Sequence, residues 1–187
     1  MKVKGFFSSL IVEHLDFAWR LTEPFLIILP STPKLNDNTI FIVPDNFKTD
    51  FASVPRIFWT IVPPATGRHV KAAVLHDWLY YTALVDKETA DWLFYKAMLL
   101  AGVNIAKAHA MYLAVKYFGH KAWYSHREKG HTLEYWLEKH GNKSVAAKKL
   151  QELGIGFILS SSQAKYDNSE TLFDLSDFLI RIAKKRE

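Results

Sequence analysis

AAVLHDWLYY, residues 72–81, is an apolar run that a histidine and an aspartate interrupt side by side. A set of positions that includes Asp77 repeats at steps of three and four residues through this stretch: Val70, Ala73, Val74, Asp77, Trp78 and Tyr81. This spacing predicts a helix that begins near Arg68. His76 and Asp77 in such a helix are either part of a functional site or two polar residues satisfied inside an ordinary core.

Two further helices are expected downstream. Asp86 is a plausible N-cap for a helix over 87–101, and Gly102 is expected to end it. Asn104 is a plausible cap for a third helix over 105–118, which closes at Gly119.

The first sixty residues have a different pattern. Short apolar or β-branched runs, separated by charged, proline-rich and asparagine-rich breaks, predict strands at 10–13, 17–21, 25–29 and 39–43. The prolines between 54 and 67 predict an irregular connection. After 119 we expect a polar, histidine-rich helical stretch to about 153, a Gly/Ser-rich break and a final helix over 169–184.

The fold class is therefore α+β. Short N-terminal strands, at about 8–43, precede a helical hairpin or bundle core at about 68–119 and a mostly helical C-terminal extension. We place the core domain at 1–123, β-rich over 1–60 and helical over 68–123, and the basic extension at 124–187.

Composition excludes some classes of protein. The 187 residues include no cysteine, which rules out disulfides, thiolate metal sites and cysteine nucleophiles. The N-terminus does not resemble a signal peptide, and no apolar run reaches the roughly 20 residues of a membrane span. We expect a soluble protein made in the cytoplasm.

The net charge of +5 is unevenly placed, with seven Lys or Arg against three Glu between 120 and 150. This face could contact phosphate, nucleic acid or anionic lipid, although a solvated helical surface is the simpler interpretation. No nucleic-acid-binding signature accompanies it, so sequence-specific binding is not expected. Three histidines of this region fit no common metal motif and are expected on the surface: His126, His131 and His140.

The helical hairpin gives His76 a partner. His76 lies about eight residues before the turn near 84–86, and Asp91 lies about six residues after it, so their heights differ by only about 3 Å. Asp91 is therefore expected opposite His76. Asp77 points about 100° away from His76, toward the preceding loop, where Asp50 is the carboxylate expected to meet it.

This arrangement suits water activation beside a hard cation. His76 would deprotonate water, Asp91 would fix its tautomer, and Asp77 with Asp50 and loop carbonyls would hold Ca²⁺ or Mg²⁺. The structural alternative remains open: the same groups would form internal hydrogen bonds, and the carboxylates would pair with Arg56 and Lys87.

Four motifs resemble a phage and prophage family known as domain of unknown function 1353. They are FKTDFASVPRIFWTIVPP (47–64), KAAVLHDWLYY (71–81), ADWLFYKAM (90–98) and AMYLAVKYFG (110–119). The resemblance covers about 5–123 and implies a bacteriophage or integrated-phage origin. It implies no particular activity.

HDWLY followed by ADWLF also resembles the core of secreted-type phospholipases A2. The resemblance implies that His76 is the base, Asp91 its partner, Asp77 the calcium carboxylate and Tyr80 a supporting hydroxyl. The glycine-rich calcium loop of those enzymes is missing here, and Asp50 would have to replace it.

Two main hypotheses follow. The first is a metal-assisted ester hydrolase of phospholipase A2 type, acting on phospholipid. The second is a non-enzymatic phage protein, either a virion accessory or assembly factor or an inhibitor of a host function, that contacts a phage or host protein. In both, the protein is made in the host cytoplasm, and in the second it is also a candidate virion component.

Overall fold

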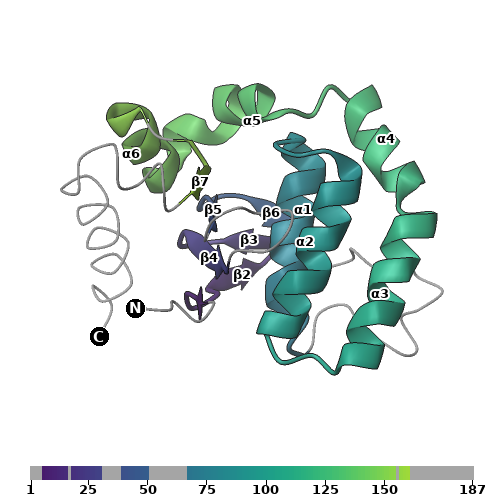
Figure 1. Ribbon diagram of the computed structural model, residues 1–187. Helices are drawn as coiled ribbons and strands as arrows, with labels where there is room; N and C mark the ends of the chain where they lie inside the picture. The colour runs from purple at the N-terminus through teal and green to yellow at the C-terminus, as the bar shows by residue number, and fades with distance from the viewer. Residues whose placement is uncertain (1–5, 17, 31–38, 51–66, 155, 161–187) are drawn as a thin grey trace.

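The computed structural model describes residues 6–16, 18–30, 39–50, 67–154 and 156–160. It confirms the α+β class: the strands come first and the helices after them, apart from a short strand at 158–160 (Figure 1). The expected connection over 54–66, Arg56 and the expected helix over 169–184 lie outside the described residues. No helix in the described part of the chain is both long and apolar enough to cross a bilayer.

The helices follow one another closely along the chain. They are α1 (Val70–Thr82), α2 (Lys87–Leu100), α3 (Ile105–Phe118), α4 (His120–Glu128), α5 (Leu133–His140), the short 3₁₀ helix η2 (Gly141–Lys143) and α6 (Val145–Leu153).

Capping explains the bounds of α2 and α3. The Asp86 carboxylate accepts the backbone N–H of Thr89 at 2.9 Å, and the Asn104 side chain accepts the N–H of Ala106 at 3.0 Å. Gly102 follows α2 with φ of +76°, a conformation that favours glycine. Both predicted caps are confirmed, and both helices have the predicted bounds within one residue.

The strands form two antiparallel sheets. They are β1 (Phe6–Phe7), β2 (Val12–His14), β3 (Trp19–Leu21), β4 (Phe25–Leu29), β5 (Thr39–Val43), β6 (Lys48–Thr49) and β7 (Ile158–Ser160). The order is β1-β4-β5-β7 in one sheet and β2-β3-β6 in the other.

The strands β4 and β5 have the predicted bounds, whereas β2 and β3 begin two residues later than expected. Three short strands, β1, β6 and β7, were not predicted. The segment at 156–160 was expected to be a break, and this was wrong because β7 forms by pairing with β5, which is far away in sequence.

Helix α1 lies at the centre of the hydrophobic core. Its buried Trp78 contacts the Phe47 ring from the β5–β6 connection, the Trp136 ring from α5 and Phe157 beside β7. Figure 1 shows the strands on one side of α1 and α2, with α3 on the other. Residues after 123 therefore share a core with the N-terminal part, while the domain boundary at 123 stays a prediction.

Candidate functional site

The hairpin of α1 and α2 brings His76 and Asp91 together. His76 Nε2 lies 2.9 Å from Asp91 Oδ1, at the relative height that the spacing predicts. Both side chains are almost completely buried, with 1% of each residue exposed. The His76 ring is packed between the rings of Tyr80, at 4.1 Å, and Phe94, at 4.7 Å.

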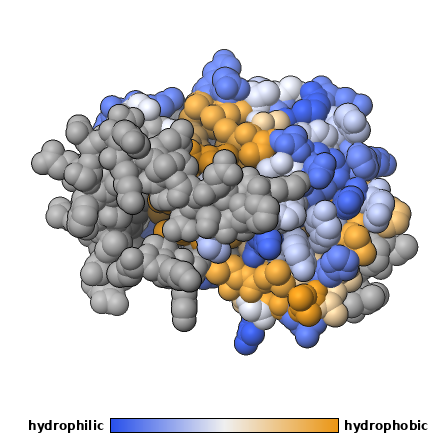
Figure 2. All heavy atoms as spheres, in the orientation of Figure 1, coloured by the Kyte–Doolittle hydropathy of each residue, from blue (hydrophilic) through white to orange (hydrophobic). Residues whose placement is uncertain are grey.

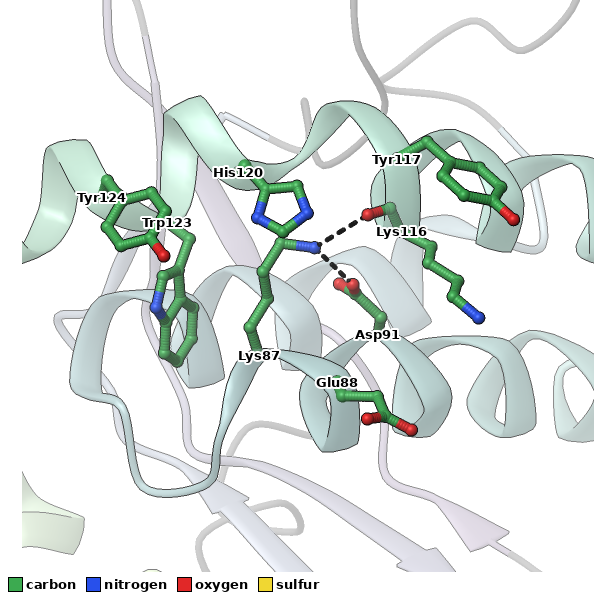
Figure 3. Close-up of a pocket in the computed structure, with 8 residues that line it drawn as sticks. All are labelled: Lys87, Glu88, Asp91, Lys116, Tyr117, His120, Trp123 and Tyr124. Atoms are coloured by element: carbon green, nitrogen blue, oxygen red, sulfur yellow. Dashed lines mark hydrogen bonds and ion pairs between the residues drawn. The ribbon is translucent and has the colours of Figure 1, made fainter.

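Asp91 has two further partners. Tyr80 Oη donates to Asp91 Oδ1 at 2.6 Å, and Lys87 Nζ donates to Asp91 Oδ2 at 2.7 Å from one turn earlier on α2. The ion pair with Lys87 is the one that the structural alternative expects. The Lys87 ammonium also donates to two carbonyls at the end of α3, that of Val115 at 3.1 Å and that of Lys116 at 3.3 Å. Figure 3 shows the contact with Lys116.

These contacts fix the protonation of the carboxyl group. Burial alone would raise the pKa of Asp91, but the hydrogen bonds from His76, Lys87 and Tyr80 outweigh it and lower the pKa. Burial and the Asp91 carboxylate raise the pKa of Tyr80, so its hydroxyl remains a donor. Asp91 is therefore an ionised acceptor at neutral pH.

The histidine is neutral in this setting. Burial lowers the pKa of His76 more than the hydrogen bond to Asp91 raises it, and the Lys87 charge lowers it further. Since the ionised Asp91 can only accept, the ring proton lies on Nε2 and Nδ1 carries a lone pair. Nδ1 is buried and has no hydrogen-bond partner among the described residues. The arrangement can act as a general base once water reaches Nδ1.

The other two predicted site residues, Asp77 and Asp50, lie where α1 packs against β6. Asp77 is half-buried and its carboxylate accepts a hydrogen bond from the Thr49 hydroxyl, so it faces the segment before 51 as expected. Asp50 directly follows Thr49 in the sequence, and its side chain is exposed. Within the described residues, no group of three or more His, Asp or Glu side chains is arranged to hold a metal ion.

Arg127 of α4 was missed by the sequence reasoning. Its Nη2 donates to the carbonyls of Tyr80 and Tyr81 at the end of α1, at 2.7 Å each, and its guanidinium lies 4.9 Å from the centre of the Trp123 ring. Trp123 in turn packs edge-on against Tyr80 at 5.2 Å. Nothing in the spacing of Arg127 indicates a contact 46 residues away.

The three histidines that were expected on the surface are each partly buried: His126, His131 and His140. His126 Nδ1 lies 2.9 Å from His131 Nδ1, both rings are partly buried, and the His131 ring stacks on Tyr81 at 4.2 Å. The spacing of the polar residues in this region does not indicate that His131 contacts Tyr81, which is 50 residues earlier in the sequence.

A pocket of about 450 Å³ lies among α2, α3 and α4, beside the Asp91 network (Figure 3). It reaches Asp91 and Lys87, and His76 is not among its lining residues. The lining consists of charged and aromatic side chains: Lys87, Glu88, Asp91, Lys116, Tyr117, His120, Trp123 and Tyr124.

Together the fold and the site define an α+β protein with a buried His–Asp–Tyr network between its first two helices. Residues 19–115 match the family described as "Protein of unknown function (DUF1353)", and the chain belongs to this family. The match covers the strands β3 to β6 and the helices that carry His76, Tyr80 and Asp91.

Two curated proteins of Sinorhizobium fredii strain NGR234 are similar to part of the chain. The uncharacterized protein y4jT is 38% identical over 78 residues, which is 41% of this chain and 23% of that protein. The uncharacterized protein y4iH is 35% identical over 78 residues, or 38% of this chain and 30% of that protein. The chain thus covers less than a third of each relative. No solved structure matches.

Proposed function

We propose that the protein is an ester hydrolase in which His76 acts as the general base. The observation that carries the proposal is the state of the imidazole ring: Nε2 is held by the ionised Asp91, and Nδ1 has a lone pair without a partner among the described residues. A base of this kind is oriented by its carboxylate and keeps its second nitrogen for the reacting proton.

The roles of the neighbouring residues follow from their contacts. His76 Nδ1 takes a proton from water, and the water oxygen forms a bond with the ester carbonyl carbon. The ester C–O bond then breaks, and the proton passes from Nδ1 to the leaving alkoxide oxygen. Asp91 stabilises the imidazolium that forms in between, and Tyr80 keeps Asp91 in position.

A hard cation belongs to this proposal through Asp77 and Asp50. Their carboxylates are the oxygen ligands that Ca²⁺ or Mg²⁺ prefers, and a bound cation would polarise the ester carbonyl. Two carboxylates supply fewer oxygen atoms than the roughly six to eight ligands that Ca²⁺ takes. The steps above therefore use the protein's own residues alone. Calcium binding is tested separately, by comparing the melting temperature in Ca²⁺ and in chelator for the wild type and Asp77→Asn.

The substrate class proposed is the phospholipid ester, on the strength of the likeness of His76, Asp77, Tyr80 and Asp91 to the phospholipase A2 core. The test is release of fatty acid from a fluorescent phospholipid with Ca²⁺ present, for the wild type and His76→Ala. His109→Ala is a matched control, because His109 is exposed on α3. Loss of at least about a hundredfold in His76→Ala alone supports the base, whereas equal rates in all three proteins contradict it.

A second candidate function is favoured by one specific observation. His76 and Asp91 are each 1% exposed, and Lys87 already neutralises Asp91, as in a purely structural network. In this proposal the protein is a non-enzymatic phage component: a virion accessory or assembly factor, or an inhibitor of a host function. Detection of the chain in purified virions, with phospholipid release at background rate, supports this candidate over the hydrolase.

A further inference from the structure

The pocket among α2, α3 and α4 has two chemically different ends. Figure 3 shows Trp123 and Tyr124 at one end and Lys116 and Tyr117 at the other, with His120 between them. Its volume of about 450 Å³ falls within the range of small-molecule sites, roughly 300–1,000 Å³. The two ends indicate a ligand that combines a ring with a charged group.

The rings at the first end are partly accessible and partly fixed. Tyr124 is 59% exposed, and the His120 ring stacks on it with an interplanar angle of 21°. Trp123 is half-buried and held by the edge of Tyr80 and the guanidinium of Arg127. A ring platform that is fixed before binding costs little ordering entropy when a planar ligand stacks on it.

The charge of the helices around the pocket favours an anion. Within the lining, Lys87 is paired with Asp91, and the charges of Lys116 and Glu88 offset each other, so the positive surplus comes from the surrounding residues. The surrounding helices α3 and α4 are basic, since Glu128 is the one acid among their residues against four cations: Lys107, Lys116, Lys121 and Arg127. Figure 2 shows hydrophilic residues over the upper right of the molecule, where α4 lies, and hydrophobic residues below them. The positive potential of α3 and α4 attracts an anionic group to the end of the pocket where Lys116 lies.

We propose that this pocket binds a small ring-bearing phosphate of the nucleoside monophosphate class. The planar base stacks on Trp123 and Tyr124, and the phosphate binds Lys116 and His120. The Glu88 carboxylate lies across the pocket from His120 and accepts from the hydroxyl or amino groups of the ligand (Figure 3). The proposed ligand contacts do not include His76, so binding is measured separately from ester hydrolysis, although the pocket also reaches Asp91.

The test is calorimetric titration of the full chain with AMP, and separately with adenosine and with inorganic phosphate as its two halves. We expect AMP to bind with a Kd below about 1 mM, and each half at least about tenfold more weakly. Adenosine binding as tightly as AMP overturns the anion contact, and phosphate binding as tightly overturns the ring contact. No detectable binding of AMP overturns the whole proposal.

Variants locate the site. Tyr124→Ala removes an exposed ring and is expected to weaken AMP binding about tenfold, and Lys116→Glu at least as much. Lys107→Glu is the control, because it makes the same change of charge on α3 outside the pocket. Equal affinity of Lys107→Glu and Lys116→Glu contradicts the assigned phosphate contact. Circular dichroism confirms that each variant is folded.

Discussion

His76 Nε2 and Asp91 Oδ1 lie 2.9 Å apart across the interface of α1 and α2, and this contact organises the polar interior of the helical core. The same carboxylate accepts from Tyr80 on α1 and from Lys87 on α2, and Lys87 continues to the carbonyls that end α3. One buried carboxylate thereby connects three helices. The network serves the stability of the fold whether or not His76 is also a base.

Asp91→Asn is expected to destabilise the protein by about 2–4 kcal/mol, because the partly buried Lys87 then loses its counter-charge. The free energy of unfolding from urea titration measures the effect. Glu138→Gln on α5 is the control, where an exposed carboxylate is replaced and a change within about 0.5 kcal/mol is expected. Equal stabilities of the two variants would show that the network contributes little.

Lys87→Met is expected to raise the pKa of His76, because the ammonium charge acts to lower it. The pKa of Asp91 is expected to rise as well, since a hydrogen bond that favours the carboxylate is lost. Titration of the His76 ring by nuclear magnetic resonance measures the first shift. A His76 pKa that stays the same or falls in Lys87→Met would refute the assigned charge effect.

Acid is expected to destabilise the protein from about pH 6.5 downward. Burial, with the charges of His131, Arg127 and Lys129, lowers the pKa of His126 from 6.5 to about 4, although Asp50 opposes this, and burial also lowers the pKa of His76. The folded protein therefore binds these protons more weakly than the unfolded chain. The stability that the neutral histidines contribute is complete above pH 6.5 and is lost as the pH falls toward 4.

Urea titrations at pH 7.5, 6 and 5 check this dependence, and each such histidine contributes at most about 1.4 kcal/mol per pH unit. His126→Gln keeps a polar side chain that does not titrate, so its stability is expected to fall less steeply between pH 6.5 and 5. Identical slopes for the variant and the wild type would contradict the burial assigned to His126.

Asp45→Ala is expected to cost about 2–4 kcal/mol, because the Asp45 carboxylate accepts from Ser144 Oγ and from the backbone N–H groups of Val145 and Ala146 at the start of α6. Asp86→Ala removes a cap within its own helix and is expected to cost about 1 kcal/mol. Thermal unfolding of both variants provides the comparison. A smaller loss of stability in Asp45→Ala than in Asp86→Ala would contradict the role of Asp45 as a cap of α6.

Sequence patterns predicted the helices and strands that depend on residues close together in the chain. The caps Asp86 and Asn104 are found where the spacing places them, and the apolar runs of β4 and β5 pair with their predicted bounds. The height match of His76 and Asp91 also followed from helix geometry and a short turn. These features depend on neighbours along the chain, so the sequence is sufficient for them.

The sequence by itself determined the α+β order, the central hairpin and the residues that meet across it. Only the tertiary structure decided which ring nitrogen of His76 faces Asp91, that Lys87 also donates to the carbonyls that end α3, and that Arg127 holds the end of α1. It also decided that Asp45 caps a helix about a hundred residues away and that β7 adds to the sheet. The physical reason is that orphan carbonyls, N–H groups and strand edges are satisfied by whatever folding brings near them, which periodicity along one segment does not encode.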